Sequence, residues 1–314
     1  TYAYDQLNRL SQAAPRDPAD GARRTTTYGY DAVGNLVTVT LPNAVVSTYS
    51  YNSLNRLQTL NVGRFGTLLA SYTHTLDASG HRTSVTELNN RRHDYTYDAL
   101  YRLTNETIAG GVADLGSLAG TIAYTLDKVG NRLSRSSSVA SVPSVLSTYD
   151  SNDRLASDTY DGNGNTTAAL SPSLLNPSDP VADIYDFENR LIRRTTTRAG
   201  QSLTIDLLYD CDGHRVSETV AAAGGSTSIV TFLVDTLNPT GYAQVVEERV
   251  NGALTGTYAY GHALLSQTQA ALSPSWVTTY YASDGHGSSR LLTDALGAIT
   301  DTYAYDAFGI QIAS

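Results

Sequence analysis

Asp284 and His286 are the clearest candidates for catalysis or metal binding in the sequence. They stand two residues apart in the run Asp284-Gly285-His286-Gly287. A carboxylate near an imidazole could serve catalysis or bind a metal ion, but either role would need further partners. The remaining histidines stand in separate segments, at His74, His81, His93, His214 and His262. We therefore interpret the pair as a hydrogen-bonded turn that Asp284 caps and the two glycines permit.

A second polar stretch, Asp161-Gly162-Asn163-Gly164-Asn165, is similar to the start of a calcium-binding loop. The EF-hand loop needs a bidentate glutamate at its twelfth position. That position is Pro172 here, so the stretch is better interpreted as a turn, with weak calcium binding as the alternative.

Cys211 is the chain's one cysteine, which excludes an intrachain disulfide. Asp210 and Asp212 flank it, and two neighbouring acids raise a thiol's pKa and suppress the reactive thiolate. We therefore predict an inert thiol. The sequence predicts no catalytic residue, metal or cofactor.

The elements that position these side chains are repeats of one short pattern. Residues 1–10 read Thr-Tyr-Ala-Tyr-Asp-Gln-Leu-Asn-Arg-Leu: two alternating tyrosines, an acid, two spacers, a turn residue and Arg-Leu. The pattern returns at 49–57, where the amide Asn52 takes the place of the acid, and at 95–103, and a version with glycine in the turn occupies 28–36. Repetition of this kind decides the architecture.

Each repeat is predicted to be a β-hairpin. Tyrosines two residues apart share one face of a strand, and aromatic residues favour half-buried pleated surfaces. The acid accepts hydrogen bonds from nearby backbone amides, and glycine or asparagine allows positive φ. The sequence therefore predicts an all-β array of hairpins without appreciable helix.

We expect two sets of residues to hold this array together. The tyrosines should stack as ladders: Tyr2, Tyr4, Tyr28, Tyr30, Tyr49, Tyr51, Tyr95, Tyr97, Tyr258, Tyr260, Tyr303 and Tyr305. The turn acids should accept backbone or arginine hydrogen bonds: Asp5, Asp31, Asp98, Asp127, Asp186, Asp210, Asp284 and Asp306.

Charge and hydropathy indicate which kinds of binding partner the sequence disfavours. The 314 residues carry a net charge of -9, which disfavours a nucleic-acid-binding surface. No run has the length and apolarity of a membrane-spanning helix, and none reads as a signal peptide. Because the chain begins within a repeat at Thr1, we expect it to be a piece of a larger polypeptide.

The repeats, together with Tyr280–Asp294 and the run Tyr305-Asp306-Ala307-Phe308-Gly309, resemble the Rhs (YD-repeat) family. Residues 1–230 look like its tyrosine–aspartate repeats. Residues 231–314 look like the start of its repeat-associated core, continuous with the array. Two departures stand out: Gly285 and His286 replace the family's usual His-Leu, and Ala307 replaces its frequent proline.

The resemblance implies a hairpin sheet wound spirally into a strongly curved, hollow, barrel-like shell that encloses a C-terminal toxin. Members include bacterial polymorphic toxins, insecticidal toxin-complex subunits, wall-associated proteins and teneurins. The family's self-cleaving protease element and toxin domain have no counterpart in this sequence, so we predict a non-catalytic scaffold that encloses or displays a cargo of the same parent chain.

Two other functions stay open. Neighbouring copies could assemble into an extracellular filament or sheath, because an open hairpin array leaves unpaired edge strands. Alternatively, the tyrosine faces could bind glycans as a surface module. In each case the resemblance implies a bacterial protein that is secreted or at the cell surface, as part of a larger protein.

Overall fold

The computed structural model describes residues 1–111, 118–170, 180–198, 200–271 and 275–314, which form strands and turns but no helix. The prediction of an all-β fold is confirmed. Among the described residues, no helix has the length and apolar character needed to cross a membrane.

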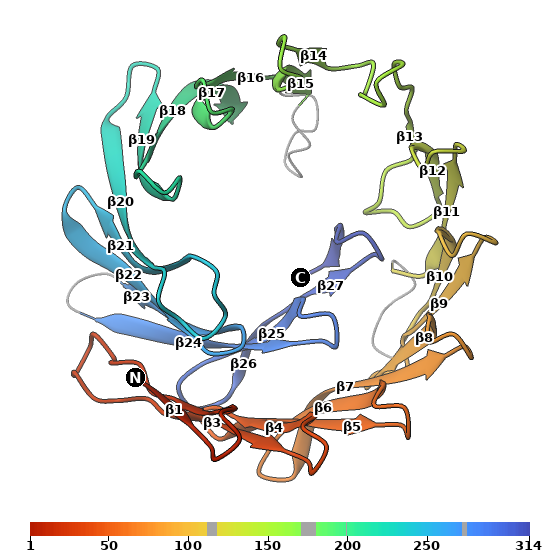
Figure 1. Ribbon diagram of the computed structural model, residues 1–314, viewed down its shortest axis with the longest axis vertical. Coiled ribbons are helices and arrows are strands. Elements are labelled where there is room, and N and C mark those ends of the chain that lie inside the picture. Colours follow the sequence, from red (N-terminus) through yellow and green to blue (C-terminus); the bar gives the residue numbers. More distant parts are fainter. Residues whose placement is uncertain (112–117, 171–179, 199, 272–274) are drawn as a thin grey trace. The chain divides into compact units, whose positions relative to one another are not determined.

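Consecutive strands pair antiparallel in a first sheet of thirteen strands in chain order (Figure 1). These strands are β1 (Tyr2–Tyr4), β2 (Leu10–Ala13), β3 (Thr26–Tyr30), β4 (Leu36–Thr40), β5 (Val45–Tyr51), β6 (Leu57–Arg64), β7 (Thr67–Leu76), β8 (Arg82–Glu87), β9 (Arg92–Tyr97), β10 (Leu103–Ala109), β11 (Gly120–Leu126), β12 (Arg132–Ser137) and β13 (Val145–Leu146).

The second antiparallel sheet also follows chain order, from β14 to β26, and a separate hairpin joins β27 to β28. The strands are β14 (Thr159–Tyr160), β15 (Thr166–Leu170), β16 (Pro180–Tyr185), β17 (Leu191–Arg198), β18 (Gln201–Tyr209), β19 (Arg215–Ala222), β20 (Thr227–Asp235), β21 (Gln244–Val250), β22 (Ala253–Tyr260), β23 (Leu264–Ala270), β24 (Trp276–Ser283), β25 (Ser289–Thr293), β26 (Ile299–Thr302), β27 (Ala304–Tyr305) and β28 (Gln311–Ala313).

The chain divides into two compact units. Unit 1 comprises Thr1–Leu146 together with Ala259–Ser314, and unit 2 comprises Ser147–Tyr258. Unit 1 therefore combines the first sheet with the C-terminal segment, residues 259–314. The sequence division expected at residue 231 stays a prediction.

Unit 1 has an apolar core between two layers. Strand alternation places Val45 and Val62 on the inner face of the first sheet. Leu265 and Leu291 of the C-terminal segment pack against this face, and Figure 1 shows strands β24 and β25 beside the first strands of the chain. A second cluster joins Ile122 of β11 to residues of β27 and β28.

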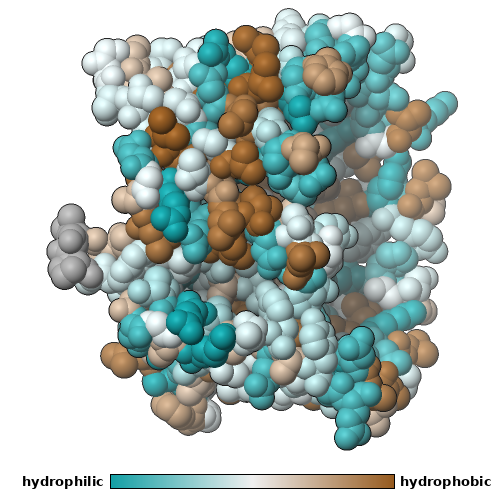
Figure 2. Space-filling view, turned by 60° about the vertical axis from the view of Figure 1, so that its left-hand side comes forward, coloured by the Kyte–Doolittle hydropathy of each residue, from teal (hydrophilic) through white to brown (hydrophobic). Residues whose placement is uncertain are grey.

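Unit 2 contains the earlier strands of the second sheet and has little buried apolar surface. Among its described residues, Val181 is the one apolar side chain classed as buried, and it is 9% exposed. Large apolar side chains on its strands stay open to solvent, including Leu208 at 62%, Leu233 at 54% and Ile229 at 47% exposure. Figure 2 shows apolar residues interleaved with polar ones on the molecular surface that it views.

A backbone irregularity recurs where many strands enter their turns. The pairing register shifts between Ala3 and Tyr4, between Ser50 and Tyr51, and between Leu208 and Tyr209. A bulge of this type adds one residue and increases the local twist. In each of these hairpins the tyrosine at the bulge stands directly before the turn acid or, at Asn52, the turn amide.

Candidate functional site

The repeated turn is the most frequent polar arrangement, and Asp98 illustrates it. Its Oδ1 accepts hydrogen bonds from the amides of Leu100 at 2.8 Å and Arg102 at 3.0 Å. Tyr101, between them, takes a left-handed conformation with φ of 61°. The hydrogen bond from the Arg102 amide is the largest of several that lower the pKa of the Asp98 carboxyl.

All eight acids named from the sequence occupy such turns. In each, Oδ1 accepts the amides two and four residues ahead: Asp5, Asp31, Asp98, Asp127, Asp186, Asp210, Asp284 and Asp306. The side chain thus satisfies amides that the hairpin ladder leaves unpaired.

Arginine four residues after the acid extends several of these turns. Arg9, Arg102 and Arg190 each place Nε 2.7 Å from Oδ2 of the preceding turn acid. Arg102 also donates from Nη1 to the carbonyl of Asp127, 2.7 Å away in the following turn. The arginine therefore links one hairpin turn to the next.

The tyrosine directly before a turn acid or amide makes a similar link through its hydroxyl group. Tyr51 donates to the carbonyl oxygen of Leu36, and Tyr97 donates to that of Arg82, at 2.8 and 2.7 Å. Tyr209 of unit 2 donates to Leu191 at 2.7 Å. Each acceptor begins the return strand of the preceding hairpin, so the hydroxyl groups fasten successive hairpins in both units.

The rings themselves have varied surroundings. Tyr28 is buried in the core of unit 1, whereas Tyr4 is 48% exposed. The rings of Tyr303 and Tyr305 are stacked with centroids 6.4 Å apart, and Tyr258 donates its hydroxyl to Glu248 at 2.9 Å. A continuous ladder of stacked tyrosines stays a prediction.

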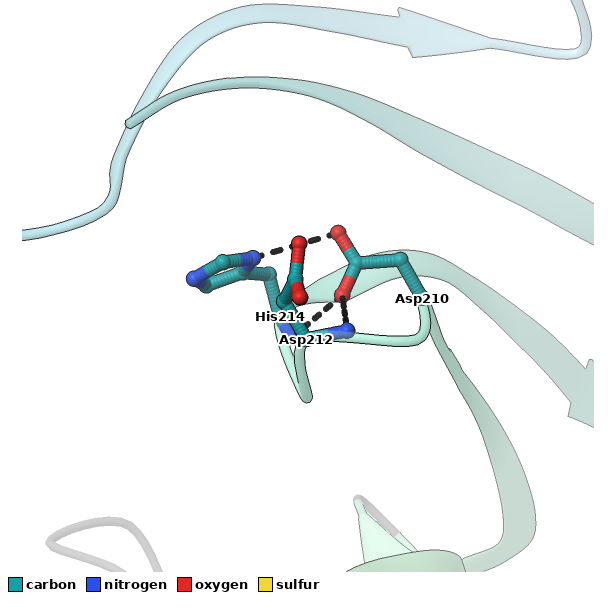
Figure 3. Close-up of side chains that lie close together, drawn as sticks. All are labelled: Asp210, Asp212 and His214. Atoms are coloured by element: carbon teal, nitrogen blue, oxygen red, sulfur yellow. Dashed lines mark hydrogen bonds and ion pairs between the residues drawn. The ribbon is translucent and has the colours of Figure 1, made fainter. Parts of the chain in front are cut away.

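Asp210, Asp212 and His214 lie together in the turn between β18 and β19 (Figure 3), with one ligand atom of each within 4.8 Å of the others. His214 Nδ1 lies 3.1 Å from Asp210 Oδ2, and the same pairing joins His81 to Asp77 at 3.0 Å. Two carboxylates and an imidazole are ligands that a divalent transition metal accepts. Because the turn hydrogen bonds already account for two of the three residues, we assign the cluster a structural role.

The other candidate stretches are also turns. Asp161 Oδ1 accepts the amides of Asn163 and Asn165, both at 2.9 Å. Cys211 is exposed and free of any disulfide. The turn that Asp284 caps also receives Arg290, whose Nη1 lies 3.1 Å from Asp284 Oδ2.

Sequence analysis missed a buried polar network inside unit 1. Arg290 of β25 contacts Glu87 of β8, with 2.5 Å between Nη2 and Oε1, and both side chains are 9% exposed. Arg91 binds the other carboxylate oxygen of Glu87 at 2.5 Å. The network therefore joins the C-terminal segment to the first sheet by charge as well as by apolar packing.

A second branch of this network centres on Glu106, which is fully buried. Its Oε1 lies 2.8 Å from His93 Nδ1, and its Oε2 accepts the amide of Ala307 at 2.8 Å. Asp306 next to this amide has a buried Oδ2 without a hydrogen-bond partner. Burial, with a smaller contribution from Glu106, raises the pKa of Asp306.

One sequence signal could have revealed this branch. Glu106 stands two residues before Ile108 in β10, so the two side chains share the inward face of the strand. A charged residue on an apolar face requires a partner. The sequence does not show which partner, because Ala307 lies 201 positions away.

Comparisons with known proteins agree with this architecture. A family model described as RHS Repeat matches residues 30–63. The curated protein "tRNA3(Ser)-specific nuclease WapA" of Bacillus spizizenii is 26% identical over 318 residues, covering 98% of this chain and 12% of that protein.

Two solved structures share the fold. The TcdB2-TccC3 crystal structure superposes with a TM-score of 0.75 at 18% identity, covering 99% of this chain and 17% of that chain. A mutant Tc holotoxin pore of Photorhabdus luminescens gives 0.71 at 18% identity, covering 99% and 18%. The resemblance to Rhs-repeat proteins is confirmed, and this chain spans under a fifth of the length of these relatives.

Proposed function

We propose that this chain is a non-catalytic wall segment of a bacterial Rhs-type protein, which encloses or displays a cargo carried elsewhere in the same parent polypeptide. The observation that carries the proposal is the chain-order pairing of antiparallel strands within each of the two large sheets, whose hairpins are linked by turn acids and tyrosine hydroxyl groups. Such an array can continue in either direction, since each hairpin depends mainly on its neighbours.

The fold likeness supports this function. The similarity in fold to TcdB2-TccC3 extends over 99% of this chain. We propose that the array is strongly curved and forms part of a spirally wound, hollow wall. The bulges before the turns favour this curvature because they increase the twist of the strands.

The polar groups of the described residues support a structural role. The turn acids are engaged by backbone amides, and Glu87 and Glu106 bind the C-terminal segment to the first sheet. The nuclease named among the relatives is matched over 12% of its length, so we assign nuclease chemistry to other parts of that protein.

We further propose that the parent protein is secreted or surface-exposed, and that its cargo resembles a toxin. The test uses the parent polypeptide with its own C-terminal region, digested with a protease under native conditions. We expect that region to survive longer in the parent protein than when it is expressed alone. Equal digestion rates would contradict an enclosing wall.

Assembly of copies into a filament is the second candidate, favoured by the exposed Leu208, Ile229 and Leu233 of unit 2. Sedimentation over a range of concentrations, followed by electron microscopy, separates it from the first. Binding to glycans through exposed rings such as Tyr101 is the third candidate, and a glycan array tests it.

A further inference from the structure

A cavity of about 650 Å³ with polar and apolar walls lies in unit 1, in the size range of small-molecule sites. Its walls come from the inner face of strands β7 to β9 and from two turns of the C-terminal segment, residues 284–288 and 306–309. The cavity therefore lies where the two layers of unit 1 meet.

Two of the acids in the cavity wall already have cationic partners. Glu87 binds Arg91 and Arg290, and Asp284 binds Arg290 through the oxygen that its turn leaves free. These contacts leave little negative charge for a ligand to neutralise at this part of the wall.

Two arginine side chains in the cavity wall, Arg82 and Arg56, have no acidic partner among the described residues. Arg82 has no side-chain hydrogen bond or ion pair with any described residue. Arg56 donates from Nη1 and Nη2 to the carbonyl oxygens of Ala78 and Ser79, which carry no formal charge. This part of the cavity therefore carries positive charge that the described residues do not balance.

His74 adds a buried, unpaired imidazole to the same wall. Its side chain belongs to a residue that is 9% exposed, and neither Nδ1 nor Nε2 has a hydrogen-bond partner. The turn at Gly285 covers the ring so closely that an added Cβ would lie 2.9 Å from Nε2. A buried donor without an acceptor is costly, so an acceptor in the cavity would stabilise this group.

His286 lies on the opposite wall, in the turn that covers His74. Burial, followed by the charge of Arg82, lowers the pKa values of both imidazoles, that of His74 to about 4. Asp284 acts on both rings in the opposite direction. Arg82 thus acts on both imidazoles, which agrees with the position of Arg82, His74 and His286 along the wall of the same cavity.

We propose that this cavity binds a small oxyanion, a carboxylate or phosphate group, between Arg82, His74 and His286. The guanidinium group supplies a fixed charge and paired donors, which suit planar or tetrahedral oxyanions. Protonation of the two imidazoles would add donors once the anion is present. This inference is independent of the cargo and of whether the wall closes around it.

The same chemistry could come from a free anion or from an acidic side chain of a polypeptide. Three probes separate these sources: inorganic phosphate, succinate and the blocked tripeptide acetyl-Ala-Glu-Ala-amide. Each is added to the whole chain at pH 6 with chloride at matched ionic strength. Imidazole C–H resonances of the six histidines report binding, and a His74→Gln variant assigns the signal of His74.

We expect at least one probe to shift the His74 signal saturably and to raise its titration midpoint, because a bound anion favours the imidazolium ion. Arg82→Gln should weaken that binding at least about tenfold, as for loss of a charged hydrogen-bonding partner. Arg92→Gln is the matched control and should leave binding unchanged, since Arg92 pairs with Asp94 and is absent from the cavity wall.

The outcomes are distinct. Saturation by phosphate or succinate identifies a free-anion site, and saturation by the tripeptide alone identifies an acidic side chain as the ligand. If no probe shifts His74 beyond the chloride control, the proposal is wrong and the cavity holds only water. Equal affinities of the unmodified chain and Arg82→Gln would overturn it as well, even if a probe binds.

Discussion

Unit 1 and unit 2 use the same hairpin repeat but are stabilised differently. Tyr97 in unit 1 and Tyr209 in unit 2 donate the same 2.7 Å hydrogen bond to a neighbouring hairpin. Only unit 1 adds a second layer, in which residues 259–314 bury an apolar core and a charged network against the first sheet.

Polar cross-strand pairs take the place of a core in unit 2. Arg194 of β17 donates two hydrogen bonds, of 2.8 and 2.7 Å, to the carboxylate of Asp183 of β16. Arg193 pairs with Asp206 of β18 on the same sheet. The repeat therefore specifies the hairpins, while the second layer determines how much apolar surface each unit buries.

The largest expected difference concerns buried charge. Glu106→Ala should destabilise unit 1 by about 3–5 kcal/mol, because it leaves His93 and the Ala307 amide without their partner in the interior. Asp183→Ala in unit 2 should cost about 1 kcal/mol, since the Arg194 side chain is 42% exposed and can turn to water.

Urea unfolding followed by circular dichroism measures both effects. Glu106→Gln is the control for Glu106→Ala, because its amide oxygen can still accept the Ala307 amide and should restore most of the loss. An equal loss of unfolding free energy for Glu106→Ala and Asp183→Ala would contradict the expected difference between the two units.

Apolar truncation should give the next largest difference. Ile122 is fully buried in unit 1, so Ile122→Ala should cost about 2–5 kcal/mol. Ile229 of unit 2 is 47% exposed, and Ile229→Ala should change the free energy of unfolding by about 0.5 kcal/mol or less. Trp276 lies in β24 of unit 1, so its fluorescence follows unfolding of that unit. A loss of about 2 kcal/mol or more for Ile229→Ala, the lower limit for a buried side chain, would show instead that Ile229 belongs to an apolar core of unit 2.

The tyrosine hydroxyl groups should contribute equally in both units. Tyr97→Phe and Tyr209→Phe each remove one hydrogen bond to a backbone carbonyl and should each cost about 0.5–1.5 kcal/mol. Denaturant midpoints of the two variants give the comparison. A cost confined to Tyr97→Phe would mean that the hairpin linkage depends on the second layer.

Acid should weaken unit 1 through His74. The pKa of His74 is about 4 in the folded chain, against 6.5 as its ordinary value. The unfolded chain therefore binds more protons between these pH values, and the stability contributed is complete above pH 6.5 and lost as pH falls toward 4. His74→Gln should flatten this part of the stability profile. Identical slopes for the unmodified chain and His74→Gln would contradict this pH dependence.

The sequence was sufficient to predict the hairpins because their information is local. The Tyr-x-Tyr-Asp pattern indicates a strand and its turn within ten residues, and the turn hydrogen bonds of Asp98 span at most four. The contacts of the second layer could not be predicted in this way. Glu87 and Arg290 lie 203 positions apart, and neither stands in a motif that names the other.

The sequence pattern also could not predict that a second layer covers the first sheet of unit 1 but not the described strands of unit 2. Strands β18 and β11 both carry alternating apolar residues, yet Ile122 is fully buried whereas Ile205 is only partly covered. A strand's own alternation shows which side chains share a face, but not whether another layer covers that face.

Hydrogen exchange under native conditions tests most directly whether the second layer makes unit 1 more stable than unit 2. Amides of β11 (Gly120–Leu126) and β18 (Gln201–Tyr209) are compared after correction for intrinsic rates, since both strands have paired neighbours on each side. We expect β11 to exchange at least about tenfold more slowly, because opening it exposes the core. Equal protection of the two strands would contradict the account.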